Sequence, residues 1–210
     1  MSNYTDRLLA FQARPDWLAE TTELLDRLPF SLTGRKVLDF GCGPGALSLL
    51  LAERGTSVVA LDTDLELLCC AKLAARDRGL KIEHQHYQGT VLPFFDRRFD
   101  VVIASHVLGH VVNPEGTLLD LHRVTAPGGV LGVINPNWWN WALRLPANLA
   151  RGYRSDPTAK WSFTAGSLRR RAKLYGWAAM QHWHTGERLG GFFPAEAFRS
   201  RFCLLMQREF

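Results

Sequence analysis

Short apolar runs alternate along much of the chain with segments whose apolar residues recur at helical spacing. The runs predict strands and the segments between them predict helices, because side chains repeat every two residues in a strand and every 3.6 in a helix. The expected strands are 37–40, 57–61, 81–87, 99–104 and 130–134, and the expected helices are 46–54, 64–75 and 115–124. This alternation predicts an α/β fold with a doubly wound, parallel sheet.

Both ends of the chain depart from this alternation. Residues 4–28 predict one or two helices ahead of the first strand, with a break at Pro15. The expected last elements are a helix at 164–175 and strands at 178–185 and 201–208. A length of 210 residues suits one domain. We expect a single domain over 1–210, with leading helices in 1–33 and an insertion at 137–177.

Three glycines follow the first strand at every second position, at Gly41, Gly43 and Gly45. A strand, a glycine turn and a helix form the ligand-binding corner of a doubly wound sheet. Gly41, Gly43 and Ala46 fit the dinucleotide pattern, so a nicotinamide cofactor stays open. Asp39 opposes it, because a carboxylate two residues before the turn would repel a pyrophosphate. The same carboxylate suits the amino group of S-adenosylmethionine, which carries no phosphate.

The stretch from Val37 to Gly45 resembles the first motif of class I S-adenosylmethionine-dependent methyltransferases. The resemblance is to their small bacterial branch, similar to the ubiquinone- and menaquinone-type enzymes. Stretches 58–64, 92–112 and 123–137 match the later motifs in the expected order. The resemblance implies a Rossmann-like sheet of seven strands, mostly parallel with an antiparallel C-terminal hairpin strand. It also implies methyl transfer from S-adenosylmethionine as the activity.

The resemblance also implies which residues bind the cofactor. Asp62 ends the second strand, where a carboxylate can accept hydrogen bonds from both ribose hydroxyls. Gln88 stands where the family commonly has an acidic residue for the adenine amino group, and its amide oxygen can still accept. The expected cofactor-binding residues are Asp39, Gly41, Gly43, Gly45, Asp62, Thr63, Gln88, Gly89, Ser105 and His106.

Two histidines after the fourth strand are the candidates for a catalytic base. His106 and His110 follow that strand, and ligands of such sheets bind at the carboxyl ends of strands. Histidine titrates near neutral pH, which suits removal of a proton from an acceptor. The family often has a glutamate in this segment, which ubiquinone-type relatives use for metal binding. Gly109 replaces it here, so we expect no metal.

Composition fits a soluble globular protein, with 47% hydrophobic and 21% charged residues. We expect a cytoplasmic protein, because we find neither a signal peptide nor an apolar run of membrane-spanning length. The charge is uneven along the chain. Residues 1–136 carry 13 Lys and Arg against 16 Asp and Glu, whereas residues 137–210 carry 12 against 4. The basic half is either a solvated face or a binding region for an anionic acceptor or RNA.

Six of the seven tryptophans lie between residues 138 and 183. In the family, the insertion after the fifth strand commonly forms the acceptor pocket, and aromatic rings there could stack on a planar acceptor or hold a lipid chain. The alternative is a hydrophobic lid packed on the core. We therefore expect methylation of a small-molecule or lipid-like acceptor, possibly anionic. An RNA-modifying enzyme and a nucleotide-binding module without catalysis are the other hypotheses, with nucleic acid less favoured.

Overall fold

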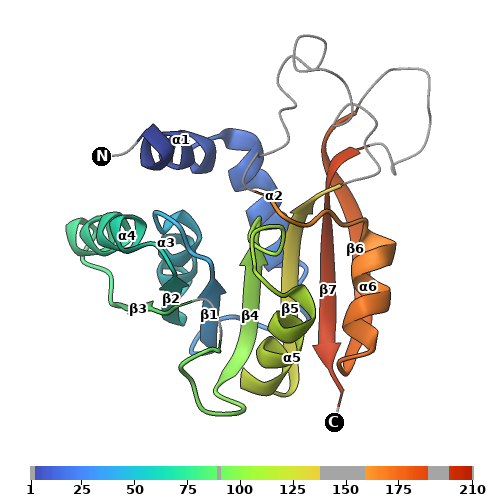
Figure 1. The fold of residues 1–210 in the computed structure, drawn as a ribbon. Coiled ribbons are helices and arrows are strands. Elements are labelled where there is room, and N and C mark those ends of the chain that lie inside the picture. Colours follow the sequence, from blue (N-terminus) through green and yellow to red (C-terminus); the bar gives the residue numbers. More distant parts are fainter. Residues whose placement is uncertain (1–2, 89–90, 138–158, 189–198, 210) are drawn as a thin grey trace.

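The computed structural model describes residues 3–88, 91–137, 159–188 and 199–209, and these fold into a sheet with helices on both faces (Figure 1). The elements in chain order are α1 (Asn3–Gln12), α2 (Pro15–Asp26), β1 (Lys36–Phe40), α3 (Ala46–Glu53), β2 (Ser57–Asp62), α4 (Leu65–Asp77), β3 (Ile82–His86), β4 (Phe99–Ser105), α5 (Pro114–Val124), β5 (Thr125–Pro136), α6 (Ala165–Lys173), β6 (Trp177–Arg188) and β7 (Arg199–Arg208).

The described strands form one seven-stranded sheet in the order β3-β2-β1-β4-β5-β7-β6. Strands β1 to β5 pair in parallel with one another, and β7 lies antiparallel between β5 and β6. The predicted fold class is therefore confirmed. The order reverses between β1 and β4, and ligands of open α/β sheets bind at such a reversal.

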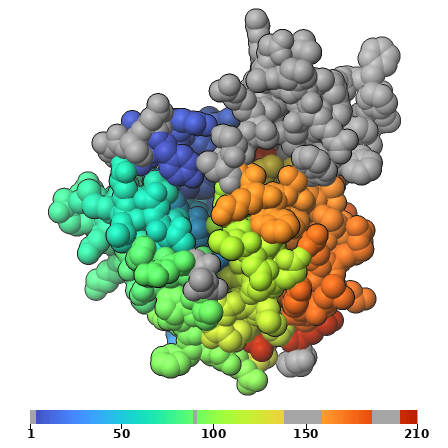
Figure 2. Space-filling model, viewed as in Figure 1, coloured from blue at the N-terminus to red at the C-terminus, as the bar shows by residue number. Residues whose placement is uncertain are grey.

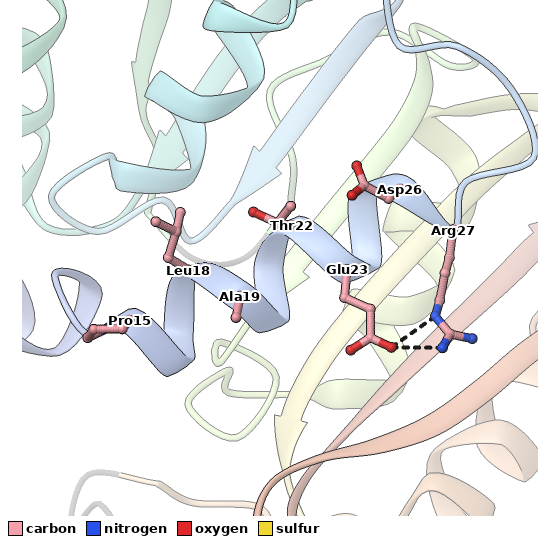
Figure 3. Close-up of a pocket in the computed structure, with 7 residues that line it drawn as sticks. All are labelled: Pro15, Leu18, Ala19, Thr22, Glu23, Asp26 and Arg27. Atoms are coloured by element: carbon pink, nitrogen blue, oxygen red, sulfur yellow. Dashed lines mark hydrogen bonds and ion pairs between the residues drawn. The ribbon is translucent and has the colours of Figure 1, made fainter.

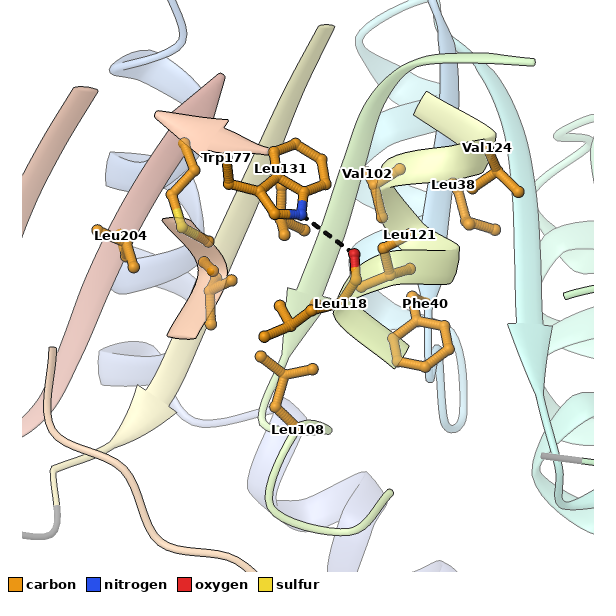
Figure 4. Packing of buried hydrophobic residues seen from close by; sticks show 14 of the residues in the cluster. Leu38, Phe40, Val102, Leu108, Leu118, Leu121, Val124, Leu131, Trp177 and Leu204 are labelled. Carbon is orange, nitrogen blue, oxygen red and sulfur yellow. Dashed lines mark hydrogen bonds between the residues drawn. The ribbon is translucent and has the colours of Figure 1, made fainter. Parts of the chain in front are cut away.

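Helices pack against both faces of the sheet, on the apolar side chains of its strands. On one face Val37 and Val101 contact side chains of α2 and α3. On the other face Leu38 and Val102 belong to a cluster with residues of α5 and α6 (Figure 4). Because neighbouring residues of β1 and β4 are buried on opposite faces, these strands are apolar at most positions, and Asp39 is a buried exception. Both expected central strands are confirmed.

Side-chain caps fix where several helices begin. Asp64 accepts hydrogen bonds from two backbone N–H groups at the start of α4, as a helix N-cap does. Thr164 and Ser167 form a reciprocal capping box at the start of α6. Helix α6 ends at Lys173, two residues before the end we expected. The leading helices are two, separated at Pro15 as the sequence indicated.

Strands in the second half are longer than the sequence predicted. The fifth strand begins at Thr125 rather than Val130, because Thr125 already pairs with Phe99. Strands β6 and β7 pair from Trp177 with Arg208 to Arg188 with Arg199, beyond the expected 178–185 and 201–208. These pairings are long-range, so the local pattern did not reveal them. None of the helices in the described ranges is both long and apolar enough to span a bilayer.

Candidate functional site

The glycine turn after β1 has the conformation that its sequence requires. Gly41, Gly43 and Gly45 all have positive φ angles, of 74°, 55° and 92°. A β-carbon on Gly41 would lie 2.3 Å from a methyl group of Val107. A β-carbon on Gly45 would lie 2.7 Å from that of Ala71. Side chains are thus excluded at both positions.

Asp62 ties the glycine turn to the end of β2. One carboxylate oxygen accepts from the Gly43 N–H at 2.8 Å, and the other accepts from the Asp64 N–H at 3.0 Å. Burial raises the pKa of Asp62, against the lowering effect of these backbone hydrogen bonds. A carboxylate offers about four acceptor positions, so two remain. That capacity fits the two hydroxyl groups of a ribose. Thr63, beside it, is exposed.

Asp39 is almost fully buried, with 1% of its surface exposed. Its carboxylate accepts a hydrogen bond from the Ser48 hydroxyl of α3 at 2.6 Å. Burial raises the pKa of Asp39 to about 7, and the charge of Asp62 adds to that rise. No sequence motif indicated a role for Ser48. The structure thus places two carboxyl groups at the glycine turn, a surrounding that opposes a pyrophosphate and favours a cationic ligand.

His106 and Ser105 follow the expected placement at the carboxyl end of β4. His106 has a left-handed φ of 56°, which is uncommon outside glycine, and its N–H donates to the Ile134 carbonyl at 2.7 Å. Its ring meets the Phe11 ring edge-on at 5.2 Å. The Ser105 hydroxyl is buried and has no hydrogen-bond partner within the described residues. His106 is next to Val107, the side chain that abuts Gly41, so it lies close to the glycine turn.

His110 lies at the end of the next turn, where its N–H donates to the Val107 carbonyl at 2.8 Å. The residues on either side of it, Gly109 and Val111, are hydrogen-bonded to the insertion. The Gly109 carbonyl accepts from the N–H groups of Lys160 and Trp161, at 2.7 and 3.0 Å. The Trp161 indole donates to the Val111 carbonyl at 2.9 Å. This end of the insertion is therefore docked on the segment that carries both candidate bases.

Gly109 itself leaves no open space for a side chain. A β-carbon there would lie 3.2 Å from the Trp161 carbonyl oxygen. A side chain at this position would therefore require the backbone of the insertion to shift by a few tenths of an ångström. Across the residues that the structure describes, no three His, Cys, Asp or Glu side chains are grouped as metal ligands. The absence of a metal stays a prediction.

The adenine side of the site is described only in part. Gln88 is exposed, and Gly89 lies outside the described residues. The loop after it is held by α5, because Arg123 donates to the carbonyls of Leu92 and Phe94 at 3.1 and 2.7 Å. Most of the aromatic insertion, residues 138–158, also lies outside the described residues. Whether 137–177 forms the acceptor side stays a prediction.

Helix α1 lies over the glycine turn. The sequence predicted leading helices but did not indicate where they pack. Its last residue, Gln12, accepts a hydrogen bond through its side-chain oxygen from the Ala46 N–H, at 3.1 Å. The Gln12 amide nitrogen would lie 3.4 Å from a β-carbon on Gly43. In Figure 2 the same helix lies at one edge of the molecule beside α4. The leading helices thus form one wall of the candidate site.

A shallow groove elsewhere runs along α2 (Figure 3). It is lined by Pro15, Leu18, Ala19, Thr22, Glu23, Asp26 and Arg27, and none of these is a predicted site residue. The Glu23–Arg27 ion pair, at 2.7 Å, lies on it. Because no convergent polar groups from the strand ends line this groove, we assign the functional site to the glycine turn and the end of β4.

The reversal in strand order, the glycine turn and the carboxylate at the end of β2 define a class I S-adenosylmethionine-dependent methyltransferase. The chain belongs to the methyltransferase domain family, whose model matches residues 10–182. Family and fold thus agree with the resemblance that the sequence motifs indicated.

Two relatives and one solved structure illustrate the similarity. A ubiquinone biosynthesis O-methyltransferase of Erwinia tasmaniensis is 34% identical over 137 residues, which cover 63% of this chain and 53% of that protein. A demethylmenaquinone methyltransferase of Thermus thermophilus is 35% identical, with 61% and 58% covered. An S-adenosylmethionine-dependent methyltransferase of Aquifex aeolicus has a TM-score of 0.74 at 17% identity, covering 97% and 98%. The chain spans about half the length of the curated relatives that it matches.

Proposed function

We propose that this protein transfers a methyl group from S-adenosylmethionine to a hydroxyl group of a small, lipid-like acceptor. The observation that carries the cofactor assignment is the pair of carboxyl groups at the glycine turn, Asp39, which is buried, and Asp62, which is partly buried. They favour a ligand with positive charge over a dinucleotide. The names of the quinone-type relatives support the acceptor class.

Bound S-adenosylmethionine supplies a methyl group that is already activated on a sulfonium, so the protein chiefly aligns and shields the reactants. Asp62 receives the ribose hydroxyls, and Asp39 faces the amino group in its ionised form. The wall formed by α1 keeps water from the site. His106 takes the proton of the acceptor, and His110 is the second candidate for this role.

The basic second half supports an acceptor that carries negative charge. Among the described residues from 137 onward, the exposed basic side chains are Lys160 and, on α6, Arg169, Arg170 and Lys173. RNA is the less favoured acceptor, and strongly salt-dependent binding of RNA would support it. The cytoplasmic location also stays a proposal.

Calorimetry tests the cofactor. We expect binding of S-adenosylmethionine and S-adenosylhomocysteine, and no binding of NAD. Asp62→Ala should weaken S-adenosylmethionine binding by about tenfold or more, because a buried acceptor of two hydrogen bonds is lost. Asp64→Ala is the matched control, since it removes a neighbouring carboxylate that caps α4 and should leave affinity within about twofold. Unchanged affinity in Asp62→Ala would refute the ribose assignment.

Methyl transfer from radiolabelled S-adenosylmethionine tests the acceptor class. The panel consists of catechols with and without an isoprenoid tail, demethylmenaquinone and total RNA. We expect labelled catechol products and faster labelling with the tail, whereas labelling of demethylmenaquinone but of neither catechol would contradict a hydroxyl acceptor. Labelling of RNA alone would contradict the proposal.

A further inference from the structure

A group of charged and polar side chains is buried between α2 and the ends of β4, β6 and β7. Glu20 of α2 is 3% exposed and Arg201 of β7 is 8% exposed. The Thr185 hydroxyl of β6 donates to one carboxylate oxygen of Glu20. The other oxygen lies 3.1 Å from Arg201 Nε. Burying a carboxylate is costly unless it is paired, and Arg201 and Thr185 supply the pairing here.

The same carboxylate oxygen lies 3.8 Å from Nε2 of His106. Neither this contact nor the one to Arg201 has hydrogen-bond geometry, so Glu20 Oε2 and His106 Nε2 are both buried without a hydrogen-bond partner among the described residues. Contacts between catalytic groups are often long in the free enzyme and tighten when substrate is bound. A small rotation of the imidazole would bring the two atoms within hydrogen-bond distance.

The backbone holds His106 in this position at an energetic cost. Its φ of 56° is unfavourable for a residue with a side chain. The bond from its N–H to Ile134 and the edge-on contact with Phe11 keep it there. Residues held in such conformations cluster at functional sites. Arg201 also donates to Asp16 at 2.8 Å, so Glu20 is not its sole counter-ion. The carboxylate of Glu20 thus has capacity left for a second cationic group.

We infer that Glu20 is a positioning residue for the reaction: it orients His106 as the base for an acceptor hydroxyl and stabilises the imidazolium that forms. The inference rests on the proposed function. The nitrogen of His106 that faces Glu20 carries the hydrogen, and the other ring nitrogen receives the acceptor proton. Orientation of a histidine by a carboxylate is an established arrangement in catalysis.

The oxygen of the acceptor hydroxyl attacks the methyl carbon while its proton moves to His106. The bond between that carbon and sulfur breaks, and its electron pair stays on sulfur as a neutral thioether. The products are a methyl ether, S-adenosylhomocysteine and a protonated histidine opposite the Glu20 carboxylate. The proton then passes to solvent.

Acceptors of different acidity distinguish a positioning role of Glu20 from a purely structural role, because only an acceptor that must lose its proton needs a base. The probes are catechol, which is protonated at about pH 8, and a nitro-substituted catechol, which is largely ionised there. We expect Glu20→Gln to lower kcat about tenfold or more with catechol and less than about threefold with nitrocatechol, with KM for S-adenosylmethionine unchanged. Glu23→Gln, on the outer side of the same helix, is the matched control and should leave both rates unchanged.

A second variant covers the case in which Glu20→Gln does not fold. Thr185→Val removes the hydroxyl that holds Glu20 but keeps every charge, and it should slow catechol selectively by a smaller factor. Equal losses with both acceptors in either variant would overturn the role of Glu20 and leave the proposed function intact. If the wild-type protein binds S-adenosylmethionine but methylates neither catechol, the proposed acceptor class fails, and the role of Glu20 fails with it.

Discussion

Asp39 makes the stability of the folded protein depend on pH in an unusual direction. Burial raises its pKa from 3.8 to about 7. The folded protein therefore keeps this proton up to near neutral pH, whereas the unfolded chain releases it near pH 4. Between these values the folded state binds more protons than the unfolded chain. Stability therefore falls as the pH rises through this window, and above it the loss is complete.

The size of the effect follows from the difference between the two pKa values. Each pKa unit corresponds to about 1.4 kcal/mol. The free energy of unfolding is therefore lower by about 4 kcal/mol above this pH window than below it. Asp39 is almost fully buried, so solvent does not screen this effect. Asp39→Asn removes the titration while its side-chain oxygen can still accept from Ser48. The variant should therefore lack this part of the pH dependence.

Urea unfolding between about pH 4 and pH 8, followed by tryptophan fluorescence, measures the effect. The buried Trp17 and Trp177 report the loss of the core. The free energy of unfolding of wild type minus that of Asp39→Asn should fall by about 4 kcal/mol across this range. Asp62 titrates in both proteins and its charge is coupled to that of Asp39, so the difference reports Asp39 together with this coupling. A difference that stays constant within about 0.5 kcal/mol would refute a raised pKa for Asp39.

Two further predictions concern the glycine turn and the insertion. Gly45→Ala should lower the free energy of unfolding by about 2–4 kcal/mol, because it adds a close contact with Ala71 to a positive φ of 92°. Gly79→Ala is the control: Gly79 also has a positive φ, but no atom lies within 4 Å of a β-carbon built there, so its free energy of unfolding should fall by only about 1 kcal/mol. Equal losses for both variants in urea titrations would contradict the steric argument. Trp161→Phe removes the indole hydrogen bond to Val111. Amide hydrogen exchange at position 161 should become faster, while the free energy of unfolding should fall by about 1 kcal/mol at most. Unchanged exchange would show that this bond does not hold the insertion.

The sequence by itself determined the order of the elements and the location of the cofactor corner. Apolar periodicity, the glycines at 41, 43 and 45, and the acid at the end of β2 are local signals, because each depends on neighbouring residues. The cap at Asp64 and the break at Pro15 were predictable for the same reason. The ends of β5, β6 and β7 were not, since they depend on pairing between distant segments.

Only the tertiary structure decided which side chains meet at the site. Glu20 and Arg201 are 181 positions apart, and no spacing in the chain links either of them to His106. The raised pKa of Asp39 likewise comes from burial and from Ser48, neither of which a local motif specifies. Long-range packing sets distances and desolvation, and these two quantities determine what a carboxylate or a histidine does at the site.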